Sequence, residues 1–393
     1  MMKKMSAKKY RNWIFCLVTC VLCIVLCQIK TGYESEQPAN SSREQVEILS
    51  VDNSMLAELG IVNSGVQYCE VRVKTGPYAG TQIRGSNIQN ADISKDKVFV
   101  AGDTAWAMLH IENGAVSSVR LIDHYRIGTE LILIGLFGVM LIIFGGVTGC
   151  GALISLVLSV IVIWQVMIPL TLSGYPTIWV ALGIVLFLTA MIDILVAGFS
   201  RITLVAISGS LLGTGLTCIL SVAFGNWLKI DGTSLTYVVP ILSQSSMQLN
   251  IRDLFLSMVF LANSGALMDL SMDIASACWE IRIHKDDITR RQMLKSGFAV
   301  GKNVIGTMTT TLILAYSGSY LSMMMYFVGQ GTPVIDLFNL KYVASEILNT
   351  LVGSFGLVTV APFTAVVACL MMTDKKHRAK VSSLPEEAQR ALD

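Results

Sequence analysis

Charged residues are scarce in this chain. Aspartate, glutamate, lysine and arginine make up 14% of its 393 residues, whereas hydrophobic residues make up 53%. Soluble domains carry about 25% charged residues, and a water-soluble core of this length cannot bury so much apolar surface. The composition therefore excludes a wholly soluble protein and predicts an integral membrane protein.

Motifs of several function classes are also missing. There is no phosphate-binding loop, no zinc signature and no recognisable Ser/His/Asp set, and all four histidines lie outside the apolar segments. We therefore expect no enzyme activity, no cofactor and no metal site. The net charge is only +2 and the basic residues fall in short runs, which excludes nucleic acid as a partner.

Cysteines are unevenly placed. Four of the nine lie in the first apolar segment, at spacings that put them roughly on one helical stripe: Cys16, Cys20, Cys23 and Cys27. Small packing residues explain them better than a metal site does. Cys69 is the only cysteine in the polar region that follows, so we expect no internal disulfide there.

The chain begins with a basic segment followed by an apolar one. Residues 13–27 resemble the core of a signal peptide, but no A-x-A cleavage site follows them. We therefore predict an uncleaved membrane anchor with a cytoplasmic N-terminus. With this anchor, the long apolar runs predict about eight transmembrane helices, the other seven at 129–147, 151–172, 177–198, 202–225, 254–278, 303–327 and 348–372.

A polar region separates the anchor from the other runs. Residues 34–45 are rich in Ser, Glu and Asn, which predicts disorder. Residues 70–73 alternate like a strand, 76–80 have turn composition, and 98–103 read as a strand running into a turn. We predict a small β-barrel, OB-like, that lacks the basic and aromatic pattern of a nucleic-acid binder and serves as a docking or gating module.

The expected organisation has four parts. They are a cytoplasmic basic N-terminus with the anchor (1–30), an extracytoplasmic β-rich domain (31–127), a seven-helix transmembrane bundle (128–372) and a cytoplasmic tail (373–393). Short cytoplasmic loops are rich in Lys and Arg, and this order places the most basic segments inside. Those segments contain Arg282, Lys285, Arg290, Arg291, Lys295 and Lys302 in one loop, and Lys375, Lys376, Arg378 and Lys380 in the tail.

Two carboxylates stand out inside a predicted span. Asp269 and Asp273 lie one helical turn apart in 254–278, on a stripe that continues to Glu280. An ionisable side chain at membrane depth costs about 2.5 to 3.5 kcal/mol on insertion, so each needs a partner or a function. Two ionised acids one turn apart repel each other, which makes them poor structural contacts.

The next span carries a complementary polar stripe. Asn303, Thr307, Thr310 and Thr311 lie along 303–327, and two polar faces adjacent in sequence can meet in a bundle. We favour a proton or cation relay through these residues and the two acids. The alternative is structural: hydroxyls and amides satisfy buried carboxylates and hold the helices together.

Two further charged residues are secondary candidates, together with Glu280. Asp193 and Arg201 bracket the cytoplasmic end of 177–198, where both side chains are expected to reach solvent as ordinary helix ends. In the following span, Gly209 and Gly213 form a G-x-x-x-G pattern, which predicts close helix packing within the chain.

The acidic span and its neighbour resemble the YibE/F-like family of multipass membrane proteins. Three segments carry the resemblance: Gly265-Ala266-x-Met268-Asp269-x-x-Met272-Asp273-Ile274-Ala275-Ser276-Ala277, then Gly301-x-Asn303-x-Ile305-Gly306-Thr307-Met308-x-x-Thr311-Leu312-Ile313-Leu314-Ala315-Tyr316-x-Gly318, and earlier Gly198-x-x-Arg201-x-Thr203-x-x-Ala206. Thr310 stands where that family is expected to have Asn. The resemblance implies a bacterial plasma-membrane protein and names no substrate.

A weaker similarity connects the chain with the membrane half of SecD/SecF-type proteins. It consists of an acidic span, a basic loop and a Thr-bearing span in the same order. We therefore expect a permease or proton-coupled accessory protein in the lipid bilayer, acting on protons or an unknown small solute. The alternatives are a scaffold that binds an envelope protein through its barrel and an intramembrane aspartyl protease using Asp193 and Asp269, which lacks the expected Gly-x-Gly-Asp motif.

Overall fold

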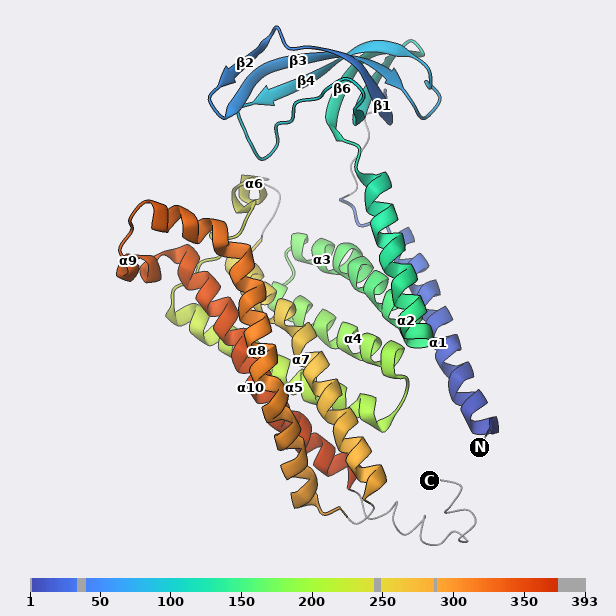
Figure 1. Ribbon diagram of the computed structural model, residues 1–393, viewed down its shortest axis with the longest axis vertical. Helices are drawn as coiled ribbons and strands as arrows, with labels where there is room; N and C mark the ends of the chain where they lie inside the picture. The colour runs from blue at the N-terminus through green and yellow to red at the C-terminus, as the bar shows by residue number, and fades with distance from the viewer. Residues whose placement is uncertain (1, 34–39, 244–248, 286–287, 374–393) are drawn as a thin grey trace. The chain divides into compact units, whose positions relative to one another are not determined.

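The computed structural model describes residues 2–33, 40–243, 249–285 and 288–373 (Figure 1). The chain divides into two compact units. One comprises residues 33–140 and contains the β-strands; the other comprises residues 1–32 together with residues from 141 onward and is helical. The predicted cytoplasmic tail after Thr373 and its basic residues lie outside the described residues.

The first unit is a closed β-barrel. Its strands are β1 (Ser41–Asp52), β2 (Leu56–Leu59), β3 (Val62–Val73), β4 (Gln82–Asn90), β5 (Thr104–Glu112) and β6 (Ala115–His124). Five of them close in the order β1-β5-β6-β4-β3 and back to β1, and among the described strands β2 pairs only with β3. The β4–β6 pairing is parallel and the others are antiparallel. The predicted small barrel is confirmed.

The barrel core follows from the alternation of its strands. Val46, Ile48, Val71 and Val73 point inward and are buried, because successive strand residues face opposite sides of the sheet. The prediction of disorder is wrong for residues 41–45, which pair with β5 as the start of β1, while 34–39 lie outside the described residues.

The connection between β4 and β5 differs from the expected strand. Residues 98–100 are not in a strand, although Phe99 is fully buried in the barrel core. The amide side chain of Gln67 holds the backbone of Phe99 by accepting a hydrogen bond from its N–H and donating one to its carbonyl oxygen. Buried side-chain amides thus replace the strand pairing that this segment lacks.

The described residues contain seven helical segments long and apolar enough to span a membrane. The helices of the chain are α1 (Met2–Gln28), α2 (Ile127–Val162), the π-helical turn η1 (Ile163–Met167), α3 (Ile168–Leu172), α4 (Thr177–Ala197), α5 (Arg201–Trp227), α6 (Val238–Ser243), α7 (Ile251–His284), α8 (Arg290–Gly329), α9 (Val334–Asn339) and α10 (Lys341–Met372). The first part of α2 belongs to the barrel-containing unit by chain contacts.

The continuous helical stretch Ile127–Leu172 is broken at Gly146. Its 46 residues would extend over about 70 Å as one helix, more than twice the thickness of the hydrocarbon core. Gly146 has φ 54° and ψ −128°, outside the helical range, and a Cβ at Gly149 would overlap the carbonyl oxygen of Leu141. The chain therefore folds back here, near the division predicted between 147 and 151, while the number of membrane crossings stays a prediction.

Two helices begin earlier than the predicted spans. α8 starts at Arg290 instead of 303, and α10 starts at Lys341 instead of 348. Charged residues in the first two turns of both helices interrupt the hydropathy pattern there, although the helices continue through them. The start of α8 is fixed by a capping box, in which Thr289 and Gln292 satisfy each other's backbone N–H groups.

The central helices of this unit are α5, α7 and α10. Their shared core includes Val205, Leu267, Leu270, Ile274 and Val360. Large hydrophobic side chains remain exposed on the outer helices, among them Phe144 on α2, Trp179 on α4 and Leu314 on α8. A surface with this much exposed apolar area is typical of a membrane-embedded protein.

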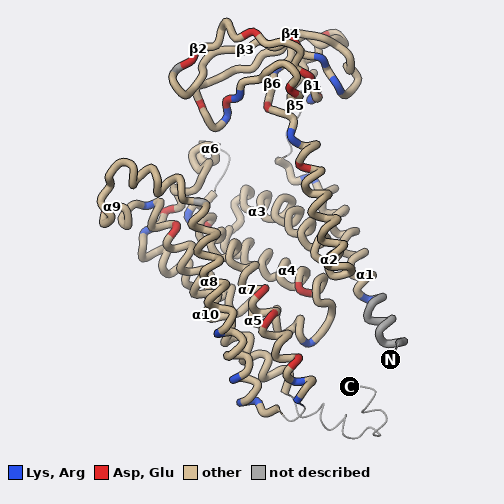
Figure 2. Tube along the Cα trace, in the orientation of Figure 1, with Lys and Arg blue, Asp and Glu red and all other residues tan. Residues whose placement is uncertain are grey.

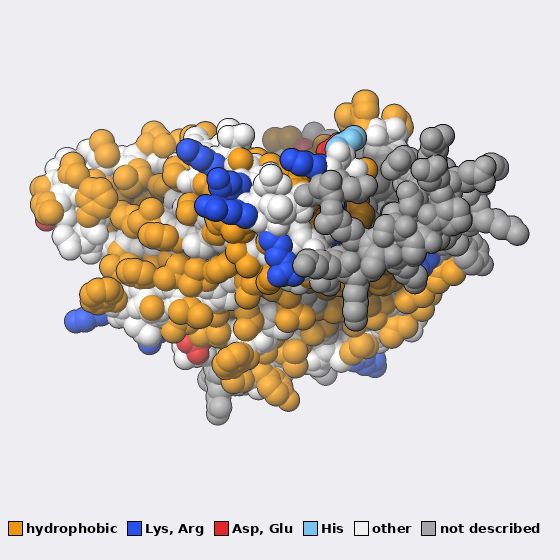
Figure 3. Space-filling model, turned by 90° about the horizontal axis from the view of Figure 1, so that it is seen from below, with side chains coloured by type: hydrophobic (Ala, Val, Ile, Leu, Met, Phe, Trp, Pro, Cys, Tyr) orange, Lys and Arg blue, Asp and Glu red, His pale blue; other side chains and the backbone are white. Residues whose placement is uncertain are grey.

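Basic side chains gather at one end of the helical unit, amid hydrophobic side chains (Figure 3). Arg290, Arg291, Lys295 and Lys302, at the start of α8, are all exposed. These are residues that the charge pattern assigns to the cytoplasmic side.

Candidate functional site

Asp193 on α4 is buried, contrary to expectation. Its side chain is only 3% exposed, and in the described part of the chain its Oδ2 atom has no hydrogen-bond partner. The prediction of a solvated helix end is therefore wrong. The position near the end of α4 suggested solvent, but α4 packs against both α5 and α7 in this unit, and the carboxyl group is covered. A carboxylate without a partner is costly in such a place.

Asp269 and Asp273 lie on the neighbouring helix α7. Asp269 is close enough to Asp193 for their charges to repel, and Asp273 interacts with Asp269 in the same way. We call Asp193, Asp269 and Asp273 the acidic site. Figure 2 shows acidic residues around α4 and α7 in a bundle with few charges in its interior. Asp269 and Asp273 are exposed at the surface of the helical unit, whereas Asp193 is covered.

The orientation of the two α7 acids follows from the packing of Ser271 between them. Ser271 is fully buried and donates a 2.7 Å hydrogen bond to the carbonyl oxygen of Ala206 on α5. Residues two positions away on a helix are rotated by about 200°, so Asp269 and Asp273 face away from the α5 and α10 side. The core contacts of α7 thereby hold both carboxylates on its outer face.

Small residues allow this packing. A Cβ at Gly209 would overlap Thr364 Oγ1 on α10, and one at Gly213 would lie 2.9 Å from a side-chain carbon of Val360. The G-x-x-x-G pattern therefore packs within the chain, as predicted.

The turn between α4 and α5 contains the motif Gly198-x-x-Arg201-x-Thr203-x-x-Ala206 described above. Gly198 has φ 72°, Ser200 caps α5 by accepting from the Thr203 N–H, and the Thr203 hydroxyl donates to the Gly198 carbonyl oxygen at 2.6 Å. Arg11 on α1 donates to the carbonyl oxygen of Phe199, which ties the first helix to this turn. Arg201 itself is exposed.

The polar stripe on α8 lies at the surface. The Thr307, Thr310 and Thr311 hydroxyls donate to carbonyl oxygens of their own helix, at 2.9, 2.9 and 3.0 Å. Asn303 and Glu280 are exposed as well. Among the described residues no hydrogen bond joins these side chains to the acidic site.

A second polar cluster links α7, α8 and α10. Tyr316 donates a 3.0 Å hydrogen bond to Asn263 Oδ1, and the carboxylate of Glu346 accepts from the side chain of Asn349 and interacts with Tyr316. Gly353 leaves room for the amide of Asn263. The hydropathy pattern missed Glu346 because the predicted span began two residues after it. A search for acids near apolar runs would have found Glu346 but not its neighbours.

No group of three or more potential metal ligands occurs among the described histidine, cysteine and acidic side chains. Cys20 and Cys23 have the C-x-x-C spacing, but both lie on α1, where Cys23 packs in a hydrophobic cluster with Leu158 and Val185. Two thiols on one helix face do not make a metal site by themselves.

Comparison with known families adds one finding. The model of the YibE/F-like protein family matches residues 133–374, well over half of the chain, and includes the acidic site, the α4–α5 turn and α8. Searches of curated proteins and of solved structures find no match. The match covers all three motif segments quoted above, which begin at Gly198, Gly265 and Gly301. The chain belongs to the YibE/F-like family.

Proposed function

We propose that this YibE/F-like chain is a membrane permease or proton-coupled accessory protein whose acidic site binds and releases a proton. The observation that carries the proposal is the buried Oδ2 atom of Asp193, which lacks a partner among the described residues and lies near the carboxylate of Asp269. Protonation of Asp193 would place an O–H donor at the unpartnered oxygen and relieve the repulsion between the two charges.

Access to this pair supports the same function. Asp193 is covered, whereas Asp269 and Asp273 reach the surface of the helical unit. In this proposal a proton arrives at Asp269 or Asp273 and passes to the covered Asp193. The threonines of α8 take no part in this geometry, so in this proposal the relay consists of the three aspartates, and Thr307, Thr310 and Thr311 are peripheral to it.

The proposal includes eight membrane crossings in a bacterial plasma membrane, with both termini in the cytoplasm. The fold at Gly146 supplies the additional crossing, because the segments on either side of it are separately apolar. The exposed basic residues at the start of α8 support the orientation. The orientation is tested with single cysteines introduced at position 295 and in the barrel. A membrane-impermeant thiol reagent added from outside should react only with the cysteine in the barrel.

Proton transport is tested in reconstituted vesicles that contain a pH-sensitive dye. We expect Asp269→Asn and Asp193→Asn each to abolish proton flux, because an amide does not exchange a proton. Asp336→Asn, at an exposed carboxylate on α9, is the matched control and should leave the flux unchanged. Wild-type flux in the Asp269→Asn protein would falsify the proposal and favour a scaffold that binds an envelope partner through its barrel.

A second candidate function is intramembrane proteolysis. The proximity of Asp193 and Asp269 favours it, because two interacting carboxylates on adjacent helices are what an aspartyl protease requires. The chain lacks the Gly-x-Gly-Asp motif. Incubation of the reconstituted protein with model transmembrane substrates separates the two functions. The site would be assigned to proteolysis if the wild-type protein cleaved a substrate but carried no proton flux, and if both Asp→Asn variants lost the cleavage.

A further inference from the structure

The outer face of the barrel carries a row of side chains that crosses several strands. Arg43 on β1 is paired in register with Met108 on β5, and Met108 is paired with Arg120 on β6. All three point outward, because their strand neighbours Leu109, Val119 and Leu121 fill the core. The row therefore places two guanidinium groups on one face of the barrel, separated by a single methionine.

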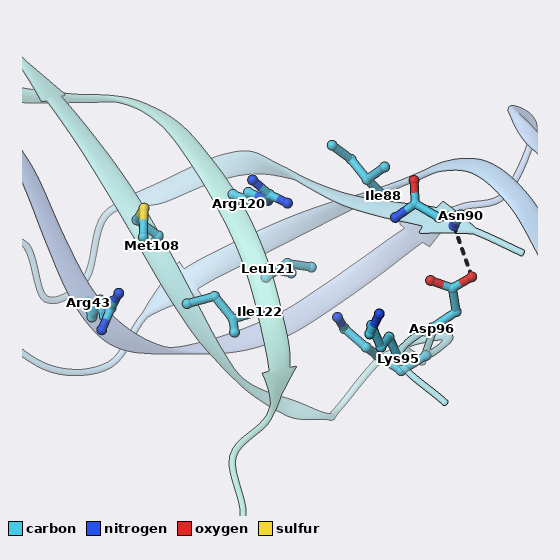
Figure 4. Close-up of a pocket in the computed structure, with 10 residues that line it drawn as sticks. Arg43, Ile88, Asn90, Lys95, Asp96, Met108, Arg120, Leu121 and Ile122 are labelled. Atoms are coloured by element: carbon cyan, nitrogen blue, oxygen red, sulfur yellow. Dashed lines mark hydrogen bonds between the residues drawn. The ribbon is translucent and has the colours of Figure 1, made fainter. Parts of the chain in front are cut away.

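A loop closes one side of this face and forms a cavity. Residues 91–98 connect β4 to the core residue Phe99, and the cavity next to them has a volume of about 380 Å³ (Figure 4). Figure 4 shows the Arg43, Arg120 and Lys95 side chains around it, with Ile88 and Ile122. The lining residues are Arg43, Ile88, Asn90, Lys95, Asp96, Lys97, Met108, Arg120, Leu121 and Ile122.

The loop is held in place by hydrogen bonds from the barrel interior. The side-chain amides of Asn87 and Gln89 both donate to the carbonyl oxygen of Lys97, at 2.6 and 2.5 Å. Asp96 accepts from the backbone N–H groups of Asn90 and Asp92. The cavity wall is therefore preorganised, and the one acidic side chain that lines the cavity is already engaged with backbone donors.

The charge of the cavity fits an anion. Four of its lining side chains are basic and one is acidic. In the described part of the chain neither Arg43 nor Arg120 has an ion-pair partner, and Arg43 Nε is buried without a hydrogen-bond acceptor. Guanidinium groups form paired hydrogen bonds with phosphate oxygens, so a phosphate group in the cavity would give Arg43 and Arg120 the anionic partner that they lack.

An apolar rim adjoins the basic cavity. Ile61 is 88% exposed, Ile93 65% and Val98 40%, and all three line a second, smaller hollow that shares Asp96 and Lys97 with the first. Exposed aliphatic side chains beside lysines and arginines are typical of a surface that contacts lipid. Only Tyr125 and Arg126 separate β6, which carries Arg120, from α2, so a bilayer that contains α2 is tethered to this strand.

We propose that this face of the barrel binds an anionic phospholipid, with the headgroup phosphate between Arg43 and Arg120 and the acyl chain against Ile61 and Ile93. The inference requires the helices to lie in a membrane and is independent of the acidic site. It gives the barrel a lipid ligand, whereas the sequence predicts a docking or gating module.

The test uses the full-length protein with a photoreactive amino acid in place of Ile93. The protein is reconstituted in vesicles of phosphatidylcholine alone or of an equimolar mixture with phosphatidylglycerol, and mass spectrometry identifies the adduct. We expect a phosphatidylglycerol adduct in the mixture. In the variant with Arg43→Gln and Arg120→Gln the adduct should fall by about tenfold, because each basic group near a membrane surface adds to the attraction.

A matched control removes two charges elsewhere on the barrel. Arg72→Gln with Arg84→Gln should keep the adduct, because both arginines lie outside the cavity and pair with Glu47 and Asp52. Arg120→Lys, which retains the charge, should keep most of it, and thermal unfolding checks that each variant is folded.

Three results would overturn the inference. The first is equal labelling of both lipids. The second is a lipid adduct that is unchanged in the Arg43→Gln, Arg120→Gln variant while binding of inorganic phosphate is lost, which would assign the cavity to a soluble anion. The third is an adduct with a protein, which would assign the face to a protein partner.

Discussion

The hydroxyl oxygens of Ser271 on α7 and Thr364 on α10 lie 2.9 Å apart, both fully buried. Ser271 also donates to the carbonyl oxygen of Ala206 on α5, so one polar junction joins the three central helices. Gly209 on α5 lies directly against it. The same junction determines which face of α7 presents Asp269 and Asp273, and it connects the packing of the bundle to its candidate site.

Gly209→Ala should destabilise the helical unit. The added methyl group overlaps Thr364 Oγ1 at a point where three helices meet, and such overpacking costs about 1 to 3 kcal/mol. Gly215→Ala on the same helix is the control, because no described side chain and no other helix lies within 4 Å of the added carbon, apart from its immediate chain neighbours. The midpoint of thermal unfolding in detergent should fall for the first variant only. Equal midpoints would show that α5 can move away from α10 at little cost.

Asp193→Asn should preserve or raise stability while removing proton flux. The substitution replaces a buried carboxyl group, whose Oδ2 has no partner in the described part of the chain, with a neutral group of similar shape. Sites retained for function commonly lower stability. Thermal unfolding and vesicle proton flux measured on the same preparation check both parts. A large loss of stability would instead identify Asp193 as a structural residue.

The Asp231–Lys341 ion pair should show a defined pH dependence. Lys341 Nζ lies 2.9 Å from Asp231 Oδ2, and this contact, with the Thr233 hydroxyl, lowers the pKa of the Asp231 carboxyl from 3.8 to about 2. Because the folded-state pKa is the lower one, the stabilisation is fully present above about pH 4 and is lost as the pH falls through 2. Both side chains are half exposed, so the effect is at most about 1 kcal/mol.

The corresponding measurement compares wild type with Asp231→Asn. The difference in unfolding midpoint should be largest near neutral pH and should shrink as the pH falls below 4. Asp336→Asn, on an exposed carboxylate that forms no ion pair with any described residue, should show no such trend. A difference that grows on acidification would mean that the folded-state pKa of Asp231 is raised, contrary to this prediction.

Gln67→Leu should loosen the β4–β5 connection of the barrel. Gln67 is fully buried and makes four hydrogen bonds: two with the backbone of Phe99, one to Asn53 and one from Asn87. Leaving these partners unsatisfied costs about 1 to 3 kcal/mol for each buried group. Hydrogen exchange at the Phe99 amide should accelerate, whereas the exposed control Gln82→Leu should leave it unchanged.

The architecture could be predicted in large part because its signals are local. A run of apolar residues long enough to cross a bilayer predicts a span wherever it occurs, and the alternation at 70–73 predicts a strand of the barrel. The helix starts at Arg290 and Lys341 lie outside the predicted spans, because charged residues occur in the first two turns of both helices and the hydropathy pattern begins only after them.

The candidate site could be predicted only in part. The spacing of Asp269 and Asp273 shows that they share a helix face, but not which neighbour that face meets. The sequence paired them with the threonines of α8, whose hydroxyls bond to their own helix instead. Glu346 lies just outside a predicted span, and its interaction with Tyr316 joins α10 to α8, whereas Asn349 lies on the same helix as Glu346.

By itself the sequence predicted the long apolar helices, the small barrel and the family, because apolar runs, strand alternation and motif spacing depend only on residues close together in the chain. The tertiary structure alone decided that Asp193 is buried beside Asp269 and that Arg43 and Arg120 share a cavity. The environment of a side chain is set by the helices or strands packed against it, and those partners come from remote parts of the chain.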